Sequence, residues 1–119
     1  MQNKLKAGDL LDEKGQLIEA GYATKLVKKY DRKMIKANKF RIKEWDYYLI
    51  YNDHYAVAIT VDDNSYMGLN SITVIDFENR CETTMSPMRF LTKGKTNLPP
   101  TSKIGDIKVQ EKNYKKTII

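Results

Sequence analysis

The stretch from Arg41 to Phe77 constrains the fold more than any other part of the chain. It contains the only Trp, five of the eight Tyr and most of the branched aliphatic residues. Two short polar breaks, Asn52-Asp53 and Asp62-Asp63-Asn64-Ser65, divide it into three runs of strand length that are rich in aromatic and β-branched residues. Asn, Asp and Ser favour turns. The stretch therefore predicts three consecutive antiparallel strands.

The lengths of the two breaks predict how these strands pair. A two-residue loop at Asn52-Asp53 sets Tyr51 opposite His54, and a four-residue second loop sets Val61 opposite Tyr66. Large side chains then face small ones across the strands, as in a small barrel that fills a tapering interior or leaves a cavity. We expect Trp45 to be buried on this inner face. The residues predicted to share the face and bind a ligand are Trp45, Tyr47, Leu49, Ala58, Thr60, Met67 and Leu69.

The remaining segments complete an all-β prediction. Residues 23–36 have a loose helical spacing and predict a short helix, with Thr24 as its cap, or an irregular extended arm. A turn at Glu78-Asn79 leads into a fourth strand that ends near Met85, and 86–100 is expected to be loop because it contains three prolines and a glycine. Residues 105–110 and 114–119 predict a final hairpin. The fold class is an antiparallel meander with at most one short helix.

Composition indicates one domain spanning residues 1–119, with a net charge of +6. The charge is segregated: 1–43 carry +7, 44–90 carry −6 and 91–119 carry +5. We expect the basic flanks to complement the acidic strands. The chain has only four Arg, and its basic segments lack the regular interleaving of aromatic and basic residues, so nucleic acid is not expected as a partner. No apolar run approaches the ~18 residues of a membrane span, and no apolar signal-peptide core is present, so a cytoplasmic location is expected.

A few polar residues of the strand region are candidates for metal binding. Asp62, Asp63 and Asn64 lack the spaced acidic partner of a calcium loop and are interpreted as a turn. A lone His54 and a lone Cys81 do not form the usual zinc sites. No metal and no cofactor are therefore predicted.

Two carboxylates flank Trp45 in the sequence and are candidates for catalytic groups. Glu44 and Asp46 lie at spacing i, i+2 on one strand face and are candidates for an acid–base pair, although a solvated rim is the commoner role for such residues. Strand alternation points Asp46 away from Trp45 and Tyr47, so these side chains do not converge on one point.

Several motifs resemble an uncharacterised bacterial family, DUF2804. They are Gly15…Gly21-Tyr22…Tyr30-Asp31-Arg32, the run Arg41-Ile-Lys-Glu-Trp-Asp-Tyr-Tyr48, Ala58-Ile-Thr60…Tyr66-Met-Gly68 and Asn97-Leu-Pro-Pro-Thr-Ser-Lys-Ile-Gly-Asp106. The resemblance runs from about Gly8 to the end, and it implies that the chain corresponds to the N-terminal portion of longer proteins.

The resemblance also implies a lipocalin-like barrel, because that family looks distantly related to proteins of the tocopherol cyclase and carotenoid hydratase type. The leading expectation is binding of a small hydrophobic or amphipathic molecule inside the barrel. One alternative is an enzyme that acts on a terpenoid-like substrate by acid–base chemistry, and another is a structural or interaction module. Because the last strand, 114–119, ends without a neighbour, we also expect a homodimer through an open strand edge.

Overall fold

The structure is a computed structural model that describes residues 2–101, 104–110 and 115–118. Its centre is an antiparallel sheet in which β3 (Glu44–Tyr51), β4 (Tyr55–Asp63), β5 (Met67–Asp76) and β6 (Cys81–Met85) follow one another in space as in sequence. A short strand, β7 (Met88–Phe90), pairs with the first part of β5. The described residues form no closed barrel, so the all-β meander is confirmed and the barrel is not.

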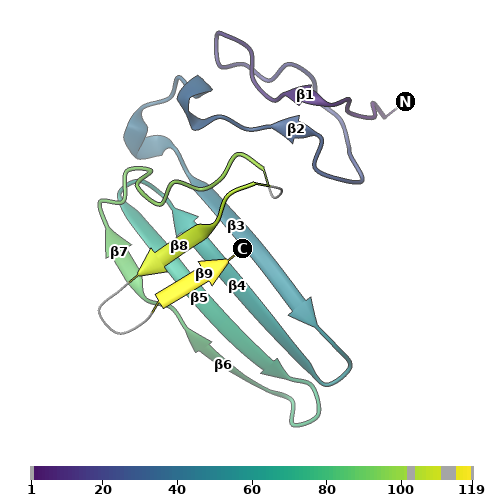
Figure 1. Cartoon of the computed structure of the whole chain (residues 1–119), viewed down its shortest axis with the longest axis vertical. Coiled ribbons are helices and arrows are strands. Elements are labelled where there is room, and N and C mark those ends of the chain that lie inside the picture. Colours follow the sequence, from purple (N-terminus) through teal and green to yellow (C-terminus); the bar gives the residue numbers. More distant parts are fainter. Residues whose placement is uncertain (1, 102–103, 111–114, 119) are drawn as a thin grey trace.

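Two further units flank this sheet. An N-terminal arm holds the parallel pair β1 (Gly8–Asp9) and β2 (Lys28–Lys29) and two 3-10 turns, Arg32–Met34 and Lys39–Arg41. A C-terminal hairpin of β8 (Ile107–Gln110) and β9 (Lys115–Ile118) crosses one face of the sheet (Figure 1). The last hairpin is therefore confirmed, while its connection lies outside the described residues.

The core lies where the hairpin meets the sheet. Ile107 and Val109 alternate inward along β8 and pack with Val61 of β4, and all three side chains are almost completely buried. Tyr48, Leu98 and Ile118 pack around this cluster. We call the covered side of the sheet the hairpin face; it carries Asp46, Tyr48, Val61 and Asn70 in neighbouring positions across β3, β4 and β5.

The opposite side of the sheet, here called the open face, carries all seven predicted ligand-binding residues. The predicted faces are therefore correct, but the predicted register is wrong. Tyr51 pairs with Ala56 rather than His54, and Val61 pairs with Asn70 rather than Tyr66. Both shifts are even numbers of residues, so no side chain changes face. The predicted turn at Glu78-Asn79 is confirmed, since Asp76 pairs with Cys81 across it.

Three other predictions are corrected. Trp45 is 64% exposed, because the described strands do not close over the open face, so its predicted burial is wrong. Of the two alternatives for 23–36, the short helix capped by Thr24 is wrong and the irregular extended arm is confirmed. Asp31 caps the turn at Arg32–Met34 by accepting a hydrogen bond from the Lys33 amide. The predicted loop 86–100 contains β7, which begins directly after Pro87 ends the preceding strand.

Candidate functional site

A cleft of about 420 Å³ lies between the N-terminal arm, the first half of β3 and the segment 98–101. Figure 1 shows these three parts meeting above the C-terminal hairpin. Most of the lining surface is apolar, and six of the fourteen lining residues have ionisable side chains. The cleft is lined by Leu10, Leu26, Lys28, Tyr30, Ile35, Lys43, Glu44, Trp45, Asp46, Tyr48, Leu98, Pro99, Pro100 and Thr101.

An ion pair joins the arm to the sheet at the edge of this cleft. The guanidinium of Arg32 pairs with the Glu44 carboxylate, and the Tyr30 hydroxyl donates a hydrogen bond to the same carboxylate. The Glu44 side chain is only 9% exposed. Burial raises the pKa of Tyr30, and the neighbouring Arg32 opposes this effect, so the phenol stays a donor. Glu44 is therefore a structural anion, with its charge already met by the arm.

The proline segment forms the opposite wall. Pro99 and Pro100 restrict the backbone, and a proline disfavours helical geometry in the residue before it, so this wall is extended. Leu98 lines the cleft and also packs against the core cluster of Val61, Ile107 and Val109. A second cleft, of about 570 Å³, lies on the other side of this wall and shares Tyr30, Leu98 and Pro100 with the first.

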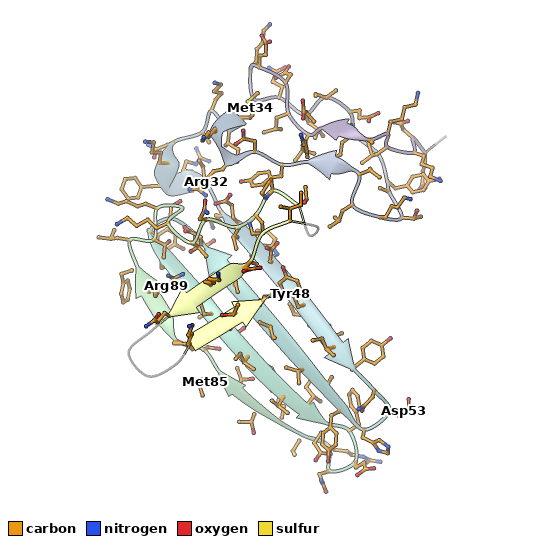
Figure 2. All side chains as sticks on the ribbon, viewed as in Figure 1. Arg32, Met34, Tyr48, Asp53, Met85 and Arg89 are labelled. Atoms are coloured by element: carbon orange, nitrogen blue, oxygen red, sulfur yellow. The ribbon has the colours of Figure 1, made fainter. Side chains whose placement is uncertain are left out.

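Beside Glu44, β3 places Asp46 and Tyr48 in the cleft from the hairpin face; Figure 2 labels Tyr48 on that strand. Burial raises the pKa of Asp46, and a hydrogen bond with Tyr48 opposes the rise. Burial likewise raises the pKa of Tyr48, and the adjacent Asp46 adds to it. The carboxyl group therefore takes up a proton more readily than an exposed aspartate does.

A comparison with models of protein families shows which family the chain belongs to. The family model of a domain of unknown function, DUF2804, matches residues 2–118. The chain belongs to the DUF2804 family. The family resemblance read from the sequence is thereby confirmed. Comparison with curated proteins and with solved structures found no match for this DUF2804 domain.

The open face of the DUF2804 domain holds the predicted ligand-binding residues in one layer. Trp45, Tyr47 and Leu49 stand out from the edge strand β3 and are 64%, 59% and 48% exposed. The other four, which are Ala58, Thr60, Met67 and Leu69, are partly buried on β4 and β5. Of the seven, Trp45 lines the cleft as well. Their role in binding stays a prediction.

The other candidate residues occupy structural positions. His54 lies in the first hairpin turn, where its Nδ1 lies 2.6 Å from Glu78, and both side chains are exposed. Cys81 is exposed and free. The Asp63 carboxylate is buried and accepts four hydrogen bonds, from Ser65, Thr92, Gly94 and Thr96. Within the described ranges, no cluster of three or more His, Cys, Asp or Glu side chains is placed to hold a metal ion, and no helix is long and apolar enough to cross a membrane.

Sequence reasoning missed most of the cleft. It singled out Trp45, Glu44 and Asp46, but it left the arm and the 97–101 segment without a role. The clearest missed signal is Leu98-Pro99-Pro100, an apolar and conformationally restricted run inside a segment interpreted as loop. In the arm, Tyr30 and Arg32 alternate with Asp31 and therefore share one side of an extended chain.

Proposed function

We propose that this DUF2804 domain binds a small hydrophobic or amphipathic molecule in the cleft between the N-terminal arm and β3. The observation that carries the proposal is the cleft itself: it is about 420 Å³ in volume, and apolar residues such as Leu26, Leu98 and Pro99 line it together with ionisable groups from the arm and from β3. Small-molecule sites are typically mostly apolar concavities of about 300–1,000 Å³ with a few placed polar groups. The cleft has both properties.

Acid–base catalysis is less well supported by the same geometry. An acid–base pair needs two groups that are free to exchange protons with a substrate. Glu44 already pairs with Arg32 and accepts from Tyr30, which leaves Asp46 as the carboxyl group of the cleft that is outside that ion pair. Binding therefore needs fewer assumptions than catalysis.

The test uses the neutral apolar fluorophore N-phenyl-1-naphthylamine and two matched leucine variants. Leu26 lies in the cleft and is 72% exposed, while Leu49 lies on the open face and is 48% exposed, so Leu26→Ser and Leu49→Ser should both fold. A buried leucine contact is worth about 1.5–3 kcal/mol, so partial loss at the site should weaken binding about fivefold or more. We expect that loss for Leu26→Ser and unchanged affinity for Leu49→Ser.

The two variants also separate the cleft from the open face. If Leu49→Ser weakens binding and Leu26→Ser does not, the ligand lies on the open face and the assignment of the cleft as the binding site is wrong. If the fluorophore does not bind at all, ligand binding itself is wrong.

A further inference from the structure

The charged side chains around the cleft are already matched by other groups of the chain. The Lys28 ammonium lies 2.5 Å from the Glu19 carboxylate, and hydrogen bonds from Lys28 and Lys6 lower the pKa of Glu19. Arg32 pairs with Glu44. Lys28, which lines the cleft, and Arg32, at its edge, therefore each have an anion of the chain as partner.

Lys43 is the other basic residue of the lining. It is exposed and lies within electrostatic reach of Asp62 on the neighbouring strand β4. By strand alternation it projects to the same side as Trp45, away from Asp46 and Tyr48. Of the lining residues that the structure describes, the two lysines thus face other carboxylates: Lys28 pairs with Glu19, and Lys43 lies near Asp62. A ligand anion placed against Asp46 would meet a carboxyl group and a phenol.

Asp46 and Tyr48 supply polar groups on the β3 side of the cleft that lie outside the ion pair of Glu44 with Arg32. Together they offer one carboxyl and one hydroxyl, groups that both accept hydrogen bonds, while the phenol and a protonated carboxyl also donate them. Burial raises the pKa of Asp46, which favours the uncharged form that can donate. Leaving a buried charge without a partner costs far more than pairing a hydroxyl with such groups.

We infer that the cleft selects a ligand whose polar end is uncharged, a hydroxyl or carbonyl on an apolar skeleton, and that Asp46 and Tyr48 bind this end. The inference rests on the proposed binding function and narrows its ligand class. It separates the site from those of fatty-acid carriers, where a free cation would be needed to meet the carboxylate.

The experiment compares three probes that share one chain and differ only in head group: 1-decanol, decanoate and decylammonium. Trp45 is the single Trp and lines the cleft, so its fluorescence reports occupancy directly. Titrations are run below the critical micelle concentration with the full chain. We expect 1-decanol to bind at least about tenfold more tightly than either ion, because an unmatched charge must be desolvated on entry.

Variants at position 46 test the contact itself. Asp46→Ala should weaken 1-decanol binding about fivefold to tenfold, the size of one lost hydrogen bond. Asp46→Asn keeps an acceptor and a donor and should stay within about twofold of the unmodified chain. Asp53→Ala removes the same charge at the far end of the sheet, in the hairpin between β3 and β4, and should have no effect (Figure 2). Far-ultraviolet circular dichroism checks that each variant folds.

The outcomes distinguish this inference from the proposed function. Tighter binding of decanoate or decylammonium, or unchanged 1-decanol affinity in Asp46→Ala, overturns the head-group assignment while leaving ligand binding intact. If none of the three probes changes Trp45 fluorescence while the apolar fluorophore still binds, the head-group assignment is also overturned and the proposed function stands. If the fluorophore does not bind either, the binding function itself fails.

Discussion

Asp63 should contribute more to stability than any other charged residue of the sheet. Its carboxylate is fully buried at the end of β4. Oδ1 accepts from the Thr92 hydroxyl at 2.6 Å, the Ser65 amide at 2.9 Å and the Gly94 amide at 3.0 Å, and Oδ2 lies 3.3 Å from the Thr96 amide. One side chain therefore holds the 92–96 segment, which leads into the proline wall of the cleft, against the sheet.

The cost of removing this carboxylate follows from those four bonds. Asp63→Ala leaves four donors without their acceptor in a buried place, and each such group costs about 1–3 kcal/mol unless water replaces the lost oxygen. Allowing for partial replacement by water, the free energy of unfolding should fall by about 3–5 kcal/mol. Asp63→Asn keeps the oxygen that three donors share but points an amide N–H₂ at the Thr96 amide. We therefore expect it to lower the free energy of unfolding by about 2–3 kcal/mol.

Urea unfolding followed by circular dichroism measures these losses. For small proteins the denaturant slope is about 1–3 kcal/mol per M, so Asp63→Ala should lower the midpoint by at least about 1 M. Asp62→Asn is the matched control, because Asp62 directly precedes Asp63 on β4 but is partly exposed. Its carboxylate accepts a hydrogen bond from the Asn64 side chain within the turn. Its effect should stay within about 0.5 kcal/mol. A midpoint change below about 0.3 M for Asp63→Ala would refute the reasoning.

The pH dependence gives an independent check. Burial raises the pKa of Asp63, but the hydrogen bonds from Thr92, Gly94, Ser65 and Thr96 outweigh it, and the folded-state pKa is lowered. Its stabilisation is therefore fully present above the unfolded value of about 3.9 and is lost as the pH falls through the lower folded value. The stability difference between the unmodified chain and Asp63→Asn should narrow below about pH 4.

Two further predictions concern the hairpin and the sheet edge. Lys116 is 6% exposed and donates hydrogen bonds to the Thr60 and Ser71 carbonyls, and burial lowers its pKa. Because replacing a buried charge by an apolar side chain of similar volume often stabilises a protein, Lys116→Met should raise the free energy of unfolding by about 1–2 kcal/mol at pH 7. Since the lowered pKa makes burial of the charged lysine unfavourable, the gain should shrink as pH rises toward about 10.4, and exposed Lys115→Met should show no gain in urea unfolding. The homodimer was expected from the last strand, 114–119, but β3 is an edge strand of the described sheet, so we expect its outer edge to be the open strand edge that pairs. Sedimentation should then show a concentration-dependent dimer that Ile50→Lys weakens, and a chain that stays monomeric at high concentration would contradict this.

The side-chain faces of the meander could be predicted from sequence because alternation has a period of two. The first turn lies one residue later than predicted, at Asp53-His54. The Asn52 side chain accepts hydrogen bonds from the His54 and Tyr55 amides, and the Asn52 amide donates to the Tyr55 carbonyl. Moving the turn by one residue shifts each cross-strand partner by two, which preserves the face. Turn chemistry thus predicted a hairpin but not its exact centre.

The second turn could not be placed because its polar residues serve a distant segment. Asp62-Asp63-Asn64 looks like a break in the strand, yet β4 continues through Asp63. Donors from 92–96 satisfy the Asp63 carboxylate, and these residues lie about thirty positions further along the chain. A buried carboxylate with long-range partners is indistinguishable from a solvated turn residue when a single sequence is read locally.

The cleft eluded prediction for the same physical reason. Its walls come from the arm, from β3 and from the Leu98–Pro100 segment, and each wall is held by a contact between distant parts of the chain. Arg32 reaches Glu44, and Leu98 packs beside Val61 and Ile107. The basic arm is thus tied to the acidic sheet, as the segregation of charge led us to expect, and this attachment turns the edge of β3 into one side of a cavity. Leu98 forms part of the cleft wall and also packs against the core cluster. A ligand that packs against Leu98 would therefore also restrain the hairpin that completes the fold.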